Sequence, residues 1–156
     1  MDLPPFQELI DAHATTIYRF LAARVGFVDA DDCFQETYLA ALRAYPELRD
    51  GSNLRAWLLT IAHNKAIDSQ RATGRRPKPV ATVPDTAVEQ PPLKERALWA
   101  LVGDLPVKQR DAVLHRFVAD LPYADVGTAM GCSEDAARRS VFEGVKKLRE
   151  LKEKLA

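Results

Sequence analysis

Apolar residues recur at helical spacing along most of the chain. In residues 4–25 they return to one face of a helix, which predicts a first helix. A second helix is expected over residues 29–44, because acids fill its first turn and Pro46 stops it. A third helix follows the turn at residues 51–53, which offers a ready N-cap, and fades around residues 71–74.

The second half of the chain continues the same pattern. It opens with a segment at residues 93–102, and Pro106 then starts a helix. The apolar residues expected on that helix are Val113, Leu114 and Phe117. A short helix over residues 122–130 and a turn lead into a long helix from Ser133. No stretch alternates as a β-strand does, so we expect an all-α fold of about three helices followed by about four.

Residues 77–92 interrupt the helical pattern. Five of the ten prolines fall there, separated by small and polar residues, which is typical of an extended linker. A segment of this length spans up to ~50 Å at the polyproline rise. We therefore expect two small helical domains, residues 1–76 and 93–156, joined by a proline-rich linker that lets them reach sites far apart.

Charge is balanced over the whole chain but not along it. The 22 basic and 22 acidic residues leave no net charge, whereas DNA-binding domains are usually basic. Residues 53–76 nevertheless hold five basic residues and one acid, and residues 138–154 hold seven basic and three acidic residues. The acids gather elsewhere, notably at Asp29, Asp31, Asp32 and Glu36. This alternation suggests faces that meet DNA and another that meets a basic protein.

The composition argues against several other classes. No apolar run reaches the length of a membrane span, and the acidic N-terminus lacks the basic start of a secretory signal, so we expect a cytoplasmic protein. Cys33 and Cys132 form no zinc spacing and are expected to be small packing residues. The three histidines lie on separate segments, and no triad order, phosphate loop or carboxylate pair is evident. We therefore expect no enzyme, no metal and no cofactor.

Residues 123–137 have the pattern of a helix-turn-helix unit. Gly127 is small where two helices would cross closely, and Gly131 can take a left-handed turn. Ser133 would cap the second helix, and Ala137 would begin its buried face. In such units the second helix lies in the major groove of DNA.

A helical wheel of the last helix places a basic face opposite an apolar one. The residues expected to be buried are Ala137, Val141, Val145 and Leu148. The opposite face carries Asp135, Arg139, Phe142 and Lys146, with Arg138 beside them. Arginine can bond guanine bidentately, and an apolar group can contact a thymine methyl. The alternative is a helical hairpin with a solvated basic face, but turn, cap and face agree and favour DNA binding.

Two stretches carry a family resemblance. The first comprises residues 29–42 and 51–68, with the wording NLRAWLLTIAHNKAID, and the second comprises residues 105–133. They resemble regions 2 and 4 of extracytoplasmic-function sigma factors of the sigma-70 family, in the family's order. The resemblance implies a factor that binds RNA polymerase core, directs it to promoters, helps to open the duplex and catalyses nothing.

The resemblance assigns roles within the first domain. The surface that docks on the coiled coil of the largest polymerase subunit matches Asp31, Asp32, Gln35 and Glu36. The part that opens and reads the −10 element offers the candidates Asn53, Arg55, Asn64, Lys65, Asp68 and Arg71. A basic surface there would recover the cost of unstacking by holding the displaced strand. Trp57 is in phase with the apolar face, so a core position is favoured over base stacking.

In the second domain the resemblance implies contacts with the polymerase flap and the −35 element. The −35 candidates are Ser133, Arg138, Arg139, Phe142, Lys146 and Lys147. The family commonly has an anti-sigma partner. The chain departs from the family at His63, where an arginine is common, at Ser69-Gln70, which thins a basic run, and at Phe142-Glu143, where histidine and arginine are usual. The last departure bears on the affinity and sequence of the −35 contact, since Glu143 would repel phosphate.

A conventional helix-turn-helix repressor or activator is the rival interpretation. It would use the C-terminal unit for DNA and the N-terminal half for dimerisation or sensing. The long proline-rich segment and the acidic edge of the second helix favour polymerase docking instead. A metal or redox sensor built on the cysteines and histidines is disfavoured, because no ligand pair has usable local spacing.

Overall fold

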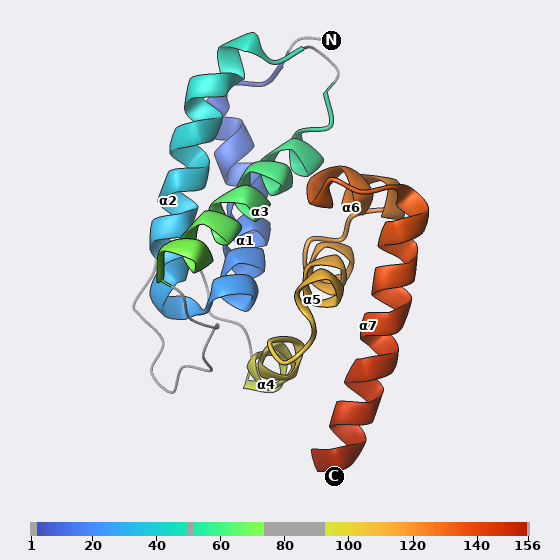
Figure 1. Cartoon of the computed structure of the whole chain (residues 1–156). Helices are drawn as coiled ribbons and strands as arrows, with labels where there is room; N and C mark the ends of the chain where they lie inside the picture. The colour runs from blue at the N-terminus through green and yellow to red at the C-terminus, as the bar shows by residue number, and fades with distance from the viewer. Residues whose placement is uncertain (1–2, 50–51, 74–92, 156) are drawn as a thin grey trace.

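The computed structural model describes residues 3–49, 52–73 and 93–155, which form helices and no strand (Figure 1). The first group comprises α1 (Phe6–Val25), α2 (Phe27–Ala44) and α3 (Leu54–Thr73). The second comprises α4 (Leu93–Val102), α5 (Val107–Val113), α6 (Tyr123–Met130) and α7 (Glu134–Leu155). A 3₁₀ turn, η1 (Tyr45–Glu47), follows α2, and a π-helical segment, η2 (Leu114–Val118), continues α5. The all-α prediction is confirmed, while the expected linker at 77–92 lies outside the described residues.

Local chemistry accounts for the helix ends of the first group. Gly26 adopts φ +88°, so α1 ends and α2 begins on either side of a single residue, two positions before the predicted start. Phe27 joins the core in that early turn. Asn53 accepts a hydrogen bond on Oδ1 from the backbone N–H of Ala56 at 3.2 Å, which confirms the predicted N-cap of α3.

The first group packs three helices around an apolar centre. Phe20 and Leu21 of α1 and Leu58 and Leu59 of α3 are all fully buried and belong to one apolar cluster. Trp57 is half-buried beside Tyr45, with ring centroids 6.1 Å apart, which confirms the expected core position. Burying such large apolar side chains contributes roughly 1.5–3 kcal/mol each.

A π-helical turn changes the apolar face of the second group. The Ala119 N–H donates to the Leu114 carbonyl at 3.0 Å, five residues back, so one extra residue enters the turn. Val113 and Leu114 are buried, whereas Phe117 is 60% exposed. The wider turn rotates Phe117 towards solvent.

The cysteines differ in environment. Cys33 is buried on α2, as a packing residue should be, whereas Cys132 is exposed in the turn after α6. The packing expectation therefore holds for Cys33 and is wrong for Cys132. Among the described residues no cluster of His, Cys, Asp or Glu could hold a metal ion.

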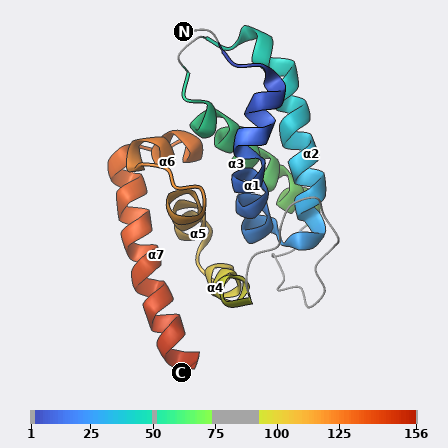
Figure 2. The same cartoon turned by 180° about the vertical axis from the view of Figure 1, so that it is seen from behind.

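The two groups of helices lie against each other. α6 packs on α3, while η2 and α4 pack on α1, as opposite views agree (Figures 1 and 2). Phe27 of α2 and Trp99 of α4 stack across the junction, with ring centroids 6.3 Å apart and planes 26° apart. The long helix α7 runs along the outer side of the second group, and none of the helices in the described parts of the chain has the length and apolarity to cross a membrane.

Candidate nucleic-acid interface

The helix-turn-helix unit has the local geometry that its residues predict. Gly131 closes α6 at φ +73°, in the left-handed region. A Cβ on Gly127 would lie 2.7 Å from the Cys132 carbonyl oxygen, so only glycine allows this approach. Ser133 accepts a hydrogen bond on its hydroxyl oxygen from the Ala136 N–H at 3.1 Å and thereby caps α7. The unit is therefore held by backbone geometry and not only by apolar packing.

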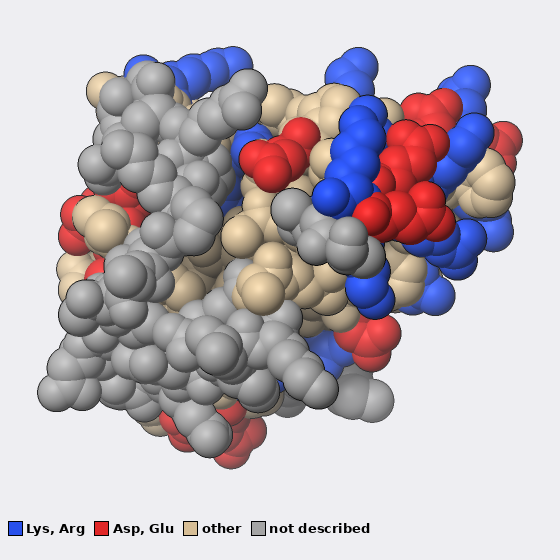
Figure 3. Space-filling model, turned by 90° about the horizontal axis from the view of Figure 1, so that it is seen from below, with Lys and Arg blue, Asp and Glu red and all other residues tan. Residues whose placement is uncertain are grey.

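The face of α7 that points away from the core is the predicted one. Ala137 and Val141 are buried, while Arg139, Phe142 and Lys146 are exposed, Phe142 to 72%. Seen from below, the side of the molecule where α7 lies carries basic and acidic side chains next to one another (Figure 3).

The two arginines at the start of α7 have different surroundings. Arg138 lies over the Tyr123 ring, 4.5 Å from its centroid, and Nη2 is 3.4 Å from Oε1 of Glu134. Arg116 of η2 lies 4.8 Å from the same ring. Arg139 is exposed and makes no contact of this kind with the described residues. The aromatic ring therefore holds Arg138 against the unit, whereas Arg139 can reach outwards.

Two further −35 candidates are already engaged within α7 or its cap. The Ser133 hydroxyl serves as the cap. Nζ of Lys147 lies 4.0 Å from a carboxylate oxygen of Glu150, three residues later and exposed. Such a surface ion pair contributes little to stability and breaks at small cost. Lys146 and Lys147 are both exposed, so they are available to phosphates.

The −10 candidates are spread along the whole of α3. Asn53 and Arg71 stand at opposite ends, about 27 Å apart at the helical rise. Asn64, Asp68 and Arg71 are exposed, and they recur at helical spacing on one side. Asn53 also donates from Nδ2 to Oδ2 of Asp125 at 2.9 Å, a contact with α6. The six candidates (Asn53, Arg55, Asn64, Lys65, Asp68 and Arg71) therefore do not form one cluster.

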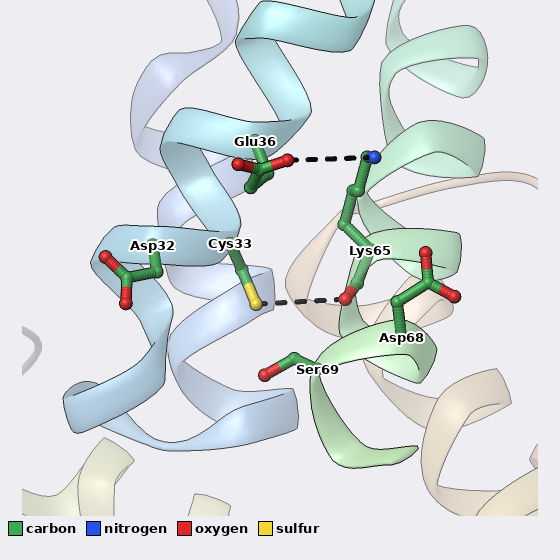
Figure 4. Close-up of a pocket in the computed structure, with 6 residues that line it drawn as sticks. All are labelled: Asp32, Cys33, Glu36, Lys65, Asp68 and Ser69. Atoms are coloured by element: carbon green, nitrogen blue, oxygen red, sulfur yellow. Dashed lines mark hydrogen bonds and ion pairs between the residues drawn. The ribbon is translucent and has the colours of Figure 1, made fainter. Parts of the chain in front are cut away.

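A pocket of about 240 Å³ joins two predicted surfaces at the seam of α2 and α3. Its lining residues are Asp32, Cys33, Glu36, Lys65, Asp68 and Ser69. Figure 4 shows Lys65 reaching towards Glu36, whose Oε2 lies 3.9 Å from Nζ, and Cys33 pointing at the Lys65 carbonyl. Burial raises the pKa of the Cys33 thiol, so this sulfur is a packing group and not a reactive one. The docking and −10 candidates thus share one seam.

The acidic edge of α2 is in place and continues into apolar residues. Asp32, Gln35 and Glu36 are exposed, and Asp31 is half-buried. Leu39 and Leu42, one and two turns on, are 47% and 52% exposed. The sequence interpretation missed this apolar extension, although its spacing from Gln35 could have indicated it. A surface of this kind can meet a partner through both charge and apolar contact.

A buried polar network between the two groups of helices was also missed. Arg24 of α1 pairs with Asp111 of α5 and donates a hydrogen bond to Gln70 of α3. Nδ1 of His63 lies 3.0 Å from Nε2 of His115, and both rings are buried. Burial is the main cause that lowers the pKa of both histidines. No local pattern could have revealed contacts between residues 40 or more positions apart.

Two protein-family models match the chain. Residues 9–76 match the model described as Sigma-70 region 2, and residues 95–148 match the model described as Sigma-70, region 4. The ECF RNA polymerase sigma factor SigD of Mycobacterium tuberculosis is 31% identical over 164 aligned positions, which cover 96% of this chain and 77% of SigD. The RNA polymerase sigma factor CarQ of Myxococcus xanthus is 30% identical, with 94% of this chain and 88% of CarQ covered.

Solved structures give the same fold. CnrH in complex with the cytosolic domain of CnrY has a TM-score of 0.76 at 21% identity, covering 97% of this chain and 89% of CnrH. The sigma factor RpoE in complex with the anti-sigma factor NepR, from Bartonella quintana, has a TM-score of 0.79 at 22% identity, covering 95% of this chain and 96% of RpoE.

Proposed function

Since the chain belongs to the extracytoplasmic-function sigma factors of the sigma-70 family, which direct promoter-specific transcription, we propose that α7 reads the −35 element and α3 holds the opened −10 strand. The main support for this proposal is the exposed face of α7, where Arg139, Phe142 and Lys146 lie side by side on a helix capped by Ser133. Arg139 leads base recognition in the major groove, Phe142 contacts a thymine methyl, and the lysines hold phosphates.

Within the same proposal Arg138 is chiefly a positioning residue. Its guanidinium is stacked on Tyr123 and paired with Glu134, which favours a contact to the DNA backbone near α6 over insertion between base edges. Ser133 acts through the cap that orients α7. Phosphate contacts of this kind fix the register of the protein on DNA without reading sequence.

The −10 strand is held along α3 by its polar exposed side. Asn64, Asp68 and Arg71 face solvent together, and Lys65 and Asp68 line the pocket at the seam with α2. Asn53 and Arg55 contact the strand at the N-terminal end of α3, next to the preceding turn. Cations and amides along one exposed side of a helix suit a single strand whose bases have been unstacked.

The acidic edge of α2 docks on RNA polymerase core. Asp32, Gln35 and Glu36 meet basic side chains of the partner, and Leu39 and Leu42 add apolar contact beside them. Asp31, half-buried, supports this edge from within. Mixed surfaces of this kind combine electrostatic steering with an apolar centre.

The remaining assignments concern the division of labour and the partners. Residues 1–76 form the core-binding and −10 unit, residues 93–156 form the −35 and flap unit, and residues 77–92 connect them. The protein acts in the cytoplasm as a transcription initiation factor and not as an enzyme. A protein inhibitor is a further partner, since two structural neighbours are complexes with CnrY and the anti-sigma factor NepR.

The test is in vitro transcription with purified core polymerase on a library of fragments from the source genome. Transcripts that appear only when the protein is added, with shared sequences upstream of their start points, are expected. Sequence-specific DNA binding by the protein alone, without any transcript from core, would instead favour a conventional repressor or activator.

A further inference from the structure

We propose that His63 and His115 form a pH-sensitive latch between the two groups of helices, closed when both rings are neutral and released as the rings become protonated. The two nitrogens lie 3.0 Å apart, His63 on α3 and His115 on η2. Phe20 of α1 stacks on the His115 ring, with centroids 4.4 Å apart. This regulation goes beyond the proposed promoter contacts and does not depend on them.

The junction concentrates the buried polar groups of the described residues. The buried charged or polar residues are Arg24, Thr37, His63, Arg110, Asp111 and His115, and all but Thr37 lie at this junction. Gln70 of α3 links them, because its Oε1 accepts from Arg24 and, at 3.4 Å, from Arg110. Permanent interfaces resemble apolar cores, whereas charged groups lose little when an interface opens and water returns. The composition therefore favours a contact made to open.

The hydrogen bond between the rings needs one facing nitrogen that donates and one that accepts. One ring nitrogen donates while the other accepts, which two neutral imidazoles can do. Protonating both rings would turn both facing nitrogens into donors and break the bond. A proton on His115 also fills its Nδ1, which is buried and has no hydrogen-bond partner among the described residues. An unsatisfied buried cationic N–H is costly.

The charges around the rings increase that cost. Arg24 of α1 lowers the pKa of both histidines, and each proton on His63 opposes one on His115. Asp111 of α5 is the nearby anion and raises the pKa of His63, but it is already paired with Arg24. Arg110 of α5 adds a second buried cation, and the one charged residue of α6, Asp125, is bonded to Asn53 instead. A further proton therefore joins an excess of positive charge.

The direction of the pH effect follows from these surroundings. Burial and Arg24 lower both pKa values in the closed form, whereas separated rings would titrate near the ordinary value of about 6.5. The neutral histidine pair therefore stabilises the closed form fully at pH values above about 6.5. This stabilisation is lost as pH falls through the lowered pKa values, because the open form binds protons more tightly.

Release of the latch has a consequence that rests on the proposed function. The −35 and −10 promoter elements, centred about 25 base pairs apart, lie about 85 Å apart on B-form DNA. In the closed form Asn53 at the start of α3 is bonded to Asp125 of α6, beside the helix-turn-helix unit. The two reading surfaces are then too close to meet both elements, so acidification would favour the form that can span a promoter.

The test is small-angle X-ray scattering of the full-length protein, without DNA or polymerase, at about pH 7.5 and about pH 5. A closed chain of this length has a radius of gyration of about 15 Å, and separated halves should exceed roughly 20 Å. We expect expansion at the lower pH with unchanged far-ultraviolet circular dichroism. An unchanged radius, or expansion together with loss of helix, would overturn the proposal.

Variants assign the effect to the two rings. The double variant His63→Gln/His115→Gln should have the same radius at both pH values, while His13→Gln, which removes the third histidine away from the junction, should expand as the wild type does. His63→Lys should be expanded already at about pH 7.5, and His63→Gln should be compact there. A double variant that still expands, a His13→Gln that does not, or a compact His63→Lys would overturn the proposal. If the double variant fails to fold, the comparison of His63→Lys with His63→Gln at about pH 7.5 still tests the proposal.

Discussion

At the scale of single residues, neighbours decide what a side chain can do. Arg138 and Arg139 are adjacent and chemically identical, yet one is stacked on Tyr123 and paired with Glu134 while the other is exposed. An arginine whose guanidinium is already occupied must give up those contacts before it can grip a base edge. The pair therefore offers a direct comparison of positioning and base reading on one helix turn.

Alanine at Arg139 should relax recognition at one base pair of the −35 element. Loss of a bidentate contact to guanine costs ~1–3 kcal/mol of discrimination. Alanine at Arg138 should change sequence preference less, and Arg149→Ala, exposed farther along α7, is the control. The measurement is competitive binding of holoenzyme to promoter duplexes from the transcription screen. Equal preference in Arg139→Ala and the wild type would refute the assignment.

A lysine that contacts phosphate should behave differently from Arg139. Replacing Lys146 by alanine should weaken binding to every sequence alike and reduce the salt dependence by about one unit, because one fewer counterion is released. Titrations of the same duplexes at several salt concentrations measure this slope. A change confined to one promoter sequence would place Lys146 on a base.

Charge reversal on α2 should weaken binding to polymerase core. Asp32→Lys with Glu36→Lys is expected to lower affinity on the order of tenfold at moderate salt. Folding should be little affected, since Glu36 is 62% exposed and a long surface ion pair such as its 3.9 Å contact with Lys65 contributes ~0–1 kcal/mol. Glu47→Lys, an exposed acid on η1, is the matched control. Undiminished affinity in a core-binding assay would contradict the docking surface.

At the scale of elements, close backbone approach shapes the helix-turn-helix unit. The crossing of α6 over the turn leaves no room for a side chain at Gly127, and the left-handed Gly131 redirects the chain into α7. The π-helical turn η2 acts similarly on the other side of α6. It supplies His115 to the junction and turns Phe117 outwards, which an unbroken α-helix would not do.

Substitutions around the turn between α6 and α7 should lower the free energy of unfolding by predictable amounts. Gly127→Ala places a Cβ 2.7 Å from backbone oxygen of Cys132 and should cost about 1–3 kcal/mol. Ser133→Ala removes the cap and should cost about 1 kcal/mol. Thr128→Ala, exposed on the same helix, is the control. Chemical denaturation measures these differences, and a neutral Gly127→Ala would mean that the crossing is looser.

At the scale of the whole molecule, the junction makes one body from two groups of helices. The aromatic stack of Phe27 on Trp99 supplies apolar contact, and the Arg24–Asp111 pair supplies charge. The apolar part favours closure, and the polar part makes closure sensitive to any unpaired charge. This balance is what allows a proton to shift the arrangement.

Removing one member of the buried pair should uncouple the two groups. Asp111→Asn leaves Arg24, only 1% exposed, without its anion, and such losses cost ~3–5 kcal/mol in a packed site. Separation of the groups relieves that cost, so calorimetry near neutral pH should resolve two transitions where the wild type has one. Asp104→Asn, exposed before α5, is the control. A single wild-type-like transition in Asp111→Asn would contradict this role.

Features that depend on neighbours within a turn or two follow from the local amino-acid sequence. Gly26, Asn53, Gly131 and Ser133 set helix ends through their own backbone freedom or capping groups, so these features are readable one residue at a time. The exposed face of α7 follows from a period of 3.6 residues. Motif wording over most of the chain also identified the family.

Contacts between distant residues became visible once the helices were packed together. The meeting of His63 with His115, of Arg24 with Asp111 and of α2 with α3 at the pocket depends on how helices cross, and no periodic pattern encodes such a crossing. The π-helical turn was invisible for the same reason, since the apolar spacing before it fits an α-helix equally well. Several local helix geometries have similar free energy, and long-range packing determines which of them forms. That packing brings His63 and His115 together.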